Sequence, residues 1–158
     1  MDTQLILGLI LTLLPVVELR AGLPVVIDYC LRNGINIWPY FAVVVLLNIF
    51  LILVIFVFLD YFHKHFLKIR MYRKIVERFI NRIWKKAGHI EKRIGTMGYI
   101  ALMIFVAVPL PGTGVWSGGI ISWILKLDRL KSFIFMALGV LISGLIVLGI
   151  SVGLFSSF

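Results

Sequence analysis

The chain has 158 residues, of which 61% are apolar, and it carries a formal net charge of +9. Several apolar stretches are long enough, or nearly long enough, to enter a bilayer, so the composition predicts an integral membrane protein. A nucleic-acid partner is not expected, because 11 of the 16 Lys and Arg residues fall in one block between Lys64 and Arg93, and charge beside membrane segments reports orientation. The single cysteine, Cys30, excludes an internal disulfide.

The N-terminal apolar run, Gln4 to Leu14, is too short to cross a bilayer. A helix of that length measures about 16 Å, against a hydrocarbon core of about 30 Å. The run leads into a stretch from Pro15 to Pro24 that is broken by Pro and Gly and contains Glu18 and Arg20. A second short apolar segment, 25–31, follows. We expect two half-helices that flank a polar tip, and no cleaved signal peptide.

Ile37 to Phe62 forms a long apolar segment in which only Asn48 and Asp60 are markedly polar. Its length predicts a full transmembrane helix with some tilt. Asn48 lies near its centre and is expected to make an interhelical hydrogen bond rather than to contact a substrate.

The basic block, residues 63–93, carries apolar residues at three- and four-residue spacing. This pattern predicts an amphipathic helix that lies flat on the membrane surface, with its cations towards lipid phosphates. A solvated linker helix packed on the rest of the protein is the alternative.

The second half repeats the order of the first. A short apolar run, 95–108, leads into a stretch rich in Pro and Gly that extends to Gly119. A second short apolar segment, 115–125, begins within that stretch. Pro disfavours a helix just upstream and Gly permits conformations closed to other residues, so one helix should stop at this break and another should start. Ser132 to Leu154 then predicts a second full span. Its glycines are expected to allow close helix contact, and the last two have the spacing of a helix-packing motif: Gly139, Gly144, Gly149 and Gly153. The ordinary glycine content of a membrane helix is the alternative.

The two halves align at a constant offset of 94 positions, which places Pro15 on Pro109. We therefore predict a single all-α integral membrane domain of two inverted repeats, 1–62 and 94–158, joined by the basic helix. Each repeat is a re-entrant helical hairpin followed by one full transmembrane helix.

The positions of Lys and Arg favour re-entry over the alternative, in which each broken pair crosses as one kinked helix. Re-entry puts 14 of the cations considered on one face and 1 on the other, whereas crossing divides them 11 to 4. In this topology the protein is a multi-pass cell-membrane protein whose basic helix is cytoplasmic and whose N- and C-termini are outside.

The two tips supply the candidate site. Glu18 and Arg20 are the only ionisable residues predicted deep in the membrane, where charges are costly unless they serve a purpose. Arg20 suits an anion and Glu18 suits a proton or a cation, although the two could simply neutralise one another. A helix that begins near Gly112 to Val115 would add free N–H groups. The predicted substrate-binding or coupling residues are Glu18, Arg20, Pro24, Pro109, Pro111, Gly112, Thr113, Gly114, Trp116 and Ser117.

No enzyme, cofactor or metal site is expected. The sequence lacks nucleophile-elbow, P-loop and zinc-protease motifs. Asp60, His63 and His65 have no specific ligand spacing.

At these tips the chain resembles the putative small multidrug export protein family, which is related to the DedA, or VTT, superfamily. The residues that carry the resemblance are Glu18-Leu19-Arg20-Ala21-Gly22-Leu23-Pro24 and Pro109-Leu110-Pro111-Gly112-Thr113-Gly114-Val115-Trp116-Ser117-Gly118. The superfamily implies facing re-entrant hairpins and movement of lipids across membranes, and the export name implies efflux of small drugs. This chain differs from the DedA pattern, since its second tip has no arginine and its first has one acid.

The leading hypothesis is a transporter or flippase for an amphiphilic anion, such as a polyprenyl-phosphate or phospholipid headgroup. Arg20 and the backbone of Gly112 to Gly114 would hold the anion, and Glu18 would couple or gate. Proton-coupled export of small cationic drugs and a non-transporting membrane scaffold are the alternatives. Membrane lipids are the expected partners. A homodimer is also expected, because a single copy has few helices with which to enclose a transport pathway.

Overall fold

The computed structural model describes residues 3–15, 17–66, 91–110 and 112–155, and every regular element in these ranges is a helix. The predicted all-helical class is confirmed for this part of the chain. Most of the basic helix expected over 63–93 lies outside the described residues. The helices are α1 (Thr3–Leu11), α2 (Glu18–Arg32), α3 (Ile37–Phe66), α5 (Glu91–Ala107), α6 (Val115–Ile124) and α7 (Arg129–Phe155).

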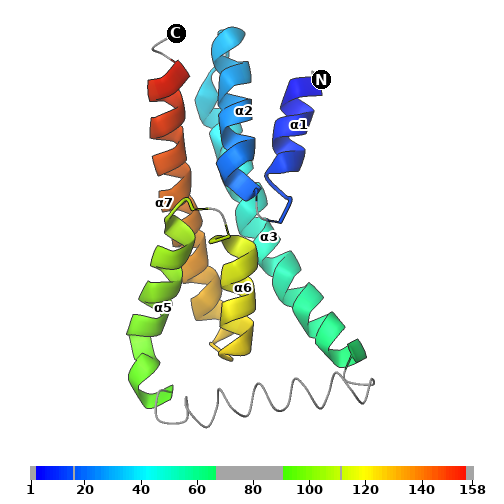
Figure 1. The fold of residues 1–158 in the computed structure, drawn as a ribbon, viewed down its shortest axis with the longest axis vertical. Coiled ribbons are helices and arrows are strands. Elements are labelled where there is room, and N and C mark those ends of the chain that lie inside the picture. Colours follow the sequence, from blue (N-terminus) through cyan, green and yellow to red (C-terminus); the bar gives the residue numbers. More distant parts are fainter. Residues whose placement is uncertain (1–2, 16, 67–90, 111, 156–158) are drawn as a thin grey trace.

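Two helical hairpins approach each other from opposite ends of the molecule (Figure 1). α1 descends to mid-height and α2 returns, while α5 rises to mid-height and α6 returns to the other end. Within the structure, each broken pair is therefore a hairpin and not one continuous kinked helix. The described N- and C-terminal helix ends lie at the same end of the molecule. Re-entry of these hairpins into a bilayer, and the inverted repeat, stay predictions.

Two helices are long and apolar enough to cross a membrane: Ile37–Phe62 within α3, and α7. Both match the spans expected from the sequence. Large apolar side chains on these helices face outward, including Phe50 at 62% and Val57 at 70% exposure. Such a surface is unfavourable in water and suits contact with lipid chains.

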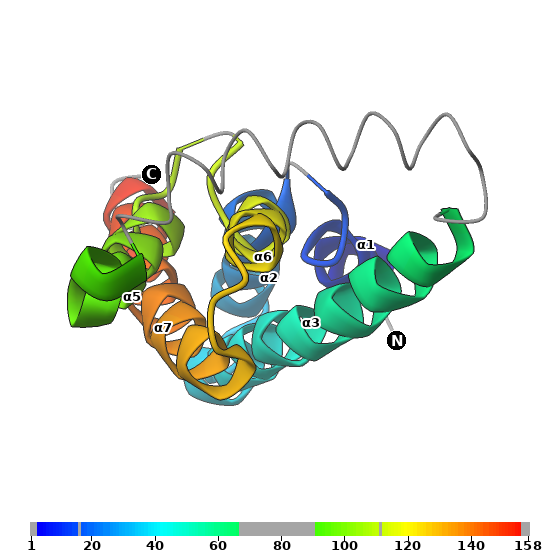
Figure 2. The ribbon, with the colours of Figure 1, turned by 90° about the horizontal axis from the view of Figure 1, so that it is seen from below.

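α2 and α6 lie end to end along the long axis, with their N-termini facing each other at mid-height (Figures 1 and 2). Both pack against α3 and α7. The core beside α2 consists of fully buried aliphatic side chains, among them Leu23, Val26 and Ile27 of α2 and Ile52 of α3. This packing fixes the height at which the two hairpin tips meet.

The first break is shorter than the sequence analysis expected. The chain leaves the helix after Leu11, and α2 begins at Glu18 and runs through Pro24 to Arg32. Pro24 lies seven residues into α2, where its missing N–H leaves the carbonyl of Arg20 without its usual helical partner. The buried neighbours Leu23 and Val26 hold this helix in the core, which explains why a proline does not end it.

Two of the four glycines of α7 that were expected to allow close helix contact, Gly139 and Gly144, lie against neighbouring helices. A Cβ built on Gly139 would lie 2.7 Å from the Met103 carbonyl oxygen of α5, and one on Gly144 would lie 3.2 Å from the Phe41 ring of α3. Cβ atoms on Gly149 and Gly153 would meet nothing within 4 Å. The packing-motif interpretation of Gly149 and Gly153 is therefore wrong within this chain.

We predict that Gly139→Ala destabilises the protein by about 1–3 kcal/mol, because α5 and α7 must move apart to admit a methyl group. Gly149→Ala is the matched control on the same helix and should cost nothing. Unfolding by sodium dodecyl sulfate in mixed micelles, followed by circular dichroism, measures both free energies. Equal stability of the two variants would contradict the packing assigned to Gly139.

Candidate functional site

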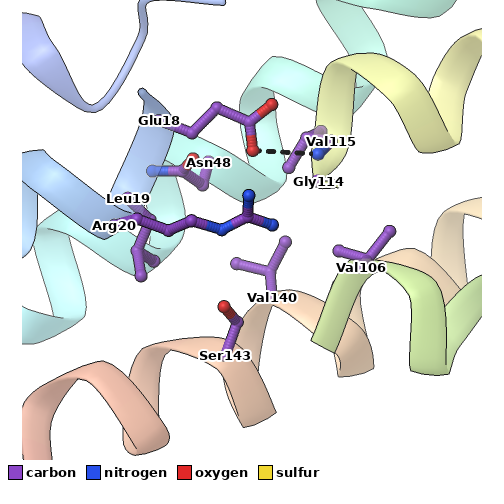
Figure 3. A pocket seen from close by; sticks show the side chains of 9 residues that line it. All are labelled: Glu18, Leu19, Arg20, Asn48, Val106, Gly114, Val115, Val140 and Ser143. Atoms are coloured by element: carbon purple, nitrogen blue, oxygen red, sulfur yellow. Dashed lines mark hydrogen bonds between the residues drawn. The ribbon is translucent and has the colours of Figure 1, made fainter. Parts of the chain in front are cut away.

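One carboxylate joins the two hairpin tips. The Glu18 side chain, 5% exposed, accepts hydrogen bonds from the backbone N–H groups of Val115, at 3.0 Å, and Trp116, at 3.1 Å. Glu18 begins α2, and Val115 and Trp116 begin α6. Figure 3 shows the carboxylate reaching across from α2 to the start of α6.

The arrangement is electrostatically favourable because two helix N-termini face one another. Each N-terminus presents unpaired N–H groups and a partial positive charge. A carboxylate between them gives charge-assisted hydrogen bonds, which are about twice as strong as neutral ones. Glu18 adopts a left-handed conformation, with φ of 47°, which costs an L-residue roughly 1–2 kcal/mol. The hydrogen bonds to α6 offset that strain.

Gly114 is the residue that allows the carboxylate to reach α6. It precedes α6 with φ of 145° and ψ of −161°, a region open essentially to glycine alone. A Cβ at this position would lie 2.1 Å from Glu18 Oε2. Gly112 also has a positive φ, 85°, but a Cβ there would meet nothing within 4 Å.

Arg20 makes the second connection between the tips. Its Nη2 donates to the Thr113 hydroxyl oxygen at 2.7 Å and to the Val108 carbonyl oxygen at 3.2 Å. The Thr113 hydroxyl in turn lies 2.8 Å from the carbonyl oxygens of Val108 and Leu110. Arg20 therefore holds the irregular backbone of the second tip, where Pro109 and Pro111 remove donors. Arg20 Nη1 is buried and has no hydrogen-bond partner among the described residues.

A cavity of about 10 Å³ lies between these charged groups. It is lined by polar side chains from α2, α3 and α7 together with apolar ones from α2, α5, α6 and α7 (Figure 3). The lining residues are Glu18, Leu19, Arg20, Asn48, Val106, Gly114, Val115, Val140 and Ser143. Its size excludes a drug or a lipid headgroup in this conformation, so the tips are closed.

The structure brings together three predicted site residues at the cavity, Glu18, Arg20 and Gly114, with Thr113 in direct contact with Arg20. The predicted anion cradle exists as the start of α6, but the chain's own Glu18 occupies it. Glu18 takes the N–H groups of Val115 and Trp116, and the Thr113 N–H donates to the Leu110 carbonyl at 3.2 Å. Binding of an external anion by the backbone from Gly112 to Gly114 stays a prediction.

The remaining predicted residues have supporting positions around the tip. The Trp116 ring packs edge-on against Phe58, with centroids 6.4 Å apart, and does not line the cavity. The Ser117 hydroxyl donates to the Gly112 carbonyl at 2.6 Å and so ties the loop to α6. Pro109 lies in the loop, Pro111 lies outside the described residues, and Pro24 lies within α2 away from the cavity. Pro24 therefore does not line this cavity, and its role in substrate binding stays a prediction.

Two polar residues of the cavity were missed as site residues. Asn48 is fully buried, and its Nδ2 donates to the Val44 carbonyl of its own helix at 3.0 Å, so the bond found is within α3 and not between helices. Its Oδ1 has no partner among the described residues. Ser143 of α7 is also buried. The sequence did mark Asn48 as a polar residue near the centre of an apolar span. It did not show that the Asn48 side chain faces the cavity, because the orientation of a helix depends on how it packs.

Asp60 and Asp28 have polar partners near the ends of helices. Asp60 accepts from Arg129 at 2.5 Å and from the Trp123 indole at 3.1 Å. Asp28 accepts from Gln4 and Arg32, both at 2.8 Å. Within the described ranges no group of three His, Cys, Asp or Glu side chains is placed to hold a metal ion.

The family model described as a putative small multi-drug export protein matches residues 18–146. The match begins at Glu18 and includes both faces of the tip contact and most of α7. No curated protein and no solved structure matches the chain.

Proposed function

We propose that this chain, which belongs to the putative small multi-drug export protein family, is a proton-coupled exporter of small cationic molecules. In this proposal Glu18 is the shared site of the proton and the substrate. The two hairpins re-enter the membrane from opposite faces and meet near its midplane.

The observation that carries the proposal is that an ionisable side chain holds the two tips together. Glu18 is buried, and its carboxylate makes the hydrogen bonds to the start of α6. A protonated carboxyl has no net charge to offer the α6 N-terminus, so its hydrogen bonds weaken to those of a neutral pair. Protonation therefore favours separation of the tips.

A cationic substrate competes for the same carboxylate. When the substrate is bound, Glu18 no longer neutralises the N-termini of α2 and α6, and the tips separate. Release of the cation and uptake of a proton must then alternate, since one carboxylate serves both. This alternation couples the movement of protons in one direction to export in the other.

The orientation follows from charge. The end of α3 and the start of α5, which flank the basic block in the sequence, lie with the turn between α6 and α7 at one end of the molecule, opposite the start of α1 and the end of α7 (Figure 1). By the positive-inside rule this end is cytoplasmic and the termini are outside. A cysteine-accessibility map that placed Thr3 and Lys126 on the same face would contradict this topology.

Movement of an amphiphilic anion is the second candidate, favoured by one observation. Arg20 Nη1 is buried without a partner among the described residues, so the guanidinium has a donor to offer an incoming phosphate. We rank this candidate second because Glu18 already occupies the N-terminus of α6. The family description is also closer to drug export.

The experiment that tests the proposal is Glu18→Gln in proteoliposomes. Gln keeps the size of the side chain but binds no proton, so ethidium transport driven by a pH gradient should fall to the level of protein-free liposomes. Asp28→Asn removes the other carboxylate of α2, which lies away from the cavity, and should retain transport. Undiminished ethidium transport by Glu18→Gln would refute the proposal.

The same vesicles separate the candidates. Flipping of a fluorescent phosphatidylglycerol, read by dithionite quenching, together with no ethidium transport would favour the anion. Normal physiological function of a chain with both Glu18 and Arg20 neutralised would favour the non-transporting scaffold.

A further inference from the structure

Two polar atoms of opposite hydrogen-bonding character are left unsatisfied at the same cavity. Arg20 Nη1 is a donor, Asn48 Oδ1 is an acceptor, and neither has a partner among the described residues. Both side chains line the cavity beside Glu18. An unpaired buried donor or acceptor costs roughly 1–3 kcal/mol, and more for a charged group. Leaving both unpaired would be expensive.

The cavity has the size and the chemistry to satisfy both atoms with one small molecule. Its volume of about 10 Å³ is close to the minimum that holds a single water. A buried water also needs two to four polar partners. The lining supplies four polar side chains, those of Glu18, Arg20, Asn48 and Ser143. A bare cation fits less well, because the guanidinium of Arg20 repels it.

We propose that this cavity binds one water molecule, which accepts a hydrogen bond from Arg20 Nη1 and donates one to Asn48 Oδ1. The second water proton is directed to Glu18 or Ser143. The water connects α2 to α3, and through Glu18 it adjoins the start of α6. It therefore makes Asn48 of the long helix α3 a part of the tip contact.

The position of this water gives Glu18 a neighbour that can deliver or remove a proton. Among the side chains that line the cavity, Arg20 is the only titratable one besides Glu18. A guanidinium does not exchange protons with a carboxylate, because it stays charged in proteins. This role for the water in proton exchange rests on the proposed proton coupling, whereas the binding site rests on geometry alone.

The test is a measurement of water contact in the full chain reconstituted in lipid. Solid-state NMR with magnetisation transferred from water should give rapid signal build-up at the Arg20 guanidinium and the Asn48 side-chain amide. The buried methyls of Leu23 serve as the dry reference. Equally slow build-up at all three positions in the wild-type protein would overturn the proposal.

A cavity-filling variant identifies the water as the one in this cavity. Val140→Ile adds a methylene to a lining residue of α7 and should reduce the build-up at Arg20 and Asn48 several-fold. Ser151→Ala changes a buried serine of the same helix that does not line the cavity, so it should leave both signals unchanged. Unchanged signals in Val140→Ile would count against the proposal.

These results are independent of the transport assay. Rapid water contact in a protein that shows no proton-driven transport would retain the binding site and reject the proposed function. Slow water contact in a protein that exports ethidium would reject the water site and retain the proposed function.

Discussion

Gly114→Ala is expected to break the contact between the hairpin tips and to abolish transport. A methyl group at this position would lie 2.1 Å from Glu18 Oε2, so the carboxylate must leave the start of α6. Residue 114 would also have to leave its φ of 145°, which is closed to alanine. The two effects together should destabilise the protein by about 3–5 kcal/mol.

Gly112→Ala is the matched control for this variant. Its φ of 85° also disfavours alanine, but the added Cβ meets nothing within 4 Å. The control should lose only the backbone contribution, about 1–3 kcal/mol, and should keep Glu18 on α6. Detergent unfolding gives the two free energies, and ethidium transport gives the two activities. Equal losses in both measurements would show that the Glu18 contact does not require a glycine at 114.

Much of the fold was predictable because it depends on apolar length and on backbone breakers. The predicted span Ile37–Phe62 starts where α3 starts and covers the apolar part of that helix, which continues to Phe66. The start of α6 was placed near Gly112 to Val115, and the helix begins at Val115. Both predictions use strong local signals, namely a long apolar run with one charged residue near its end and a cluster of Gly and Pro.

The errors arose where tertiary packing outweighs a local signal. Pro24 was read as part of a break, but α2 passes through it because its neighbours are buried in the core. Close helix contact was expected at four glycines of α7, and within this chain it is found at Gly139 and Gly144 but not at the pair with motif spacing, Gly149 and Gly153. Which glycine faces a neighbour depends on helix rotation, and spacing does not determine rotation.

The sequence predicted several residues of the site but not the hydrogen bonds between them. Charge deep in an apolar chain identified Glu18 and Arg20, and the helix start identified the donors. The sequence did not show that Glu18 itself would accept from those donors, because the pairing joins residues 97 and 98 positions apart. As a result, the sequence did not predict that the chain's own Glu18 binds the start of α6.

Arg20→Met is expected to destabilise the chain by about 3–5 kcal/mol, although methionine fills much of the volume of arginine. The substitution removes the cation that lies beside the buried Glu18 carboxylate at the cavity, and leaving a buried charge without a compensating one carries a cost of this size. It also removes the donor to Thr113 and Val108, which holds the second tip. Unfolding in mixed micelles measures the loss, and Arg20→Lys tests whether charge without the planar guanidinium is sufficient.

The double variant Glu18→Gln with Arg20→Met separates stability from function. Replacing both charged partners by neutral groups of similar volume removes the uncompensated charge, so most of the lost stability should return. Transport should not return, since no proton-binding group remains at the tips. A double variant as unstable as Arg20→Met would show that Arg20 acts through the loop at Thr113 and not through Glu18. A double variant that still exports ethidium would place the proton site elsewhere in the chain.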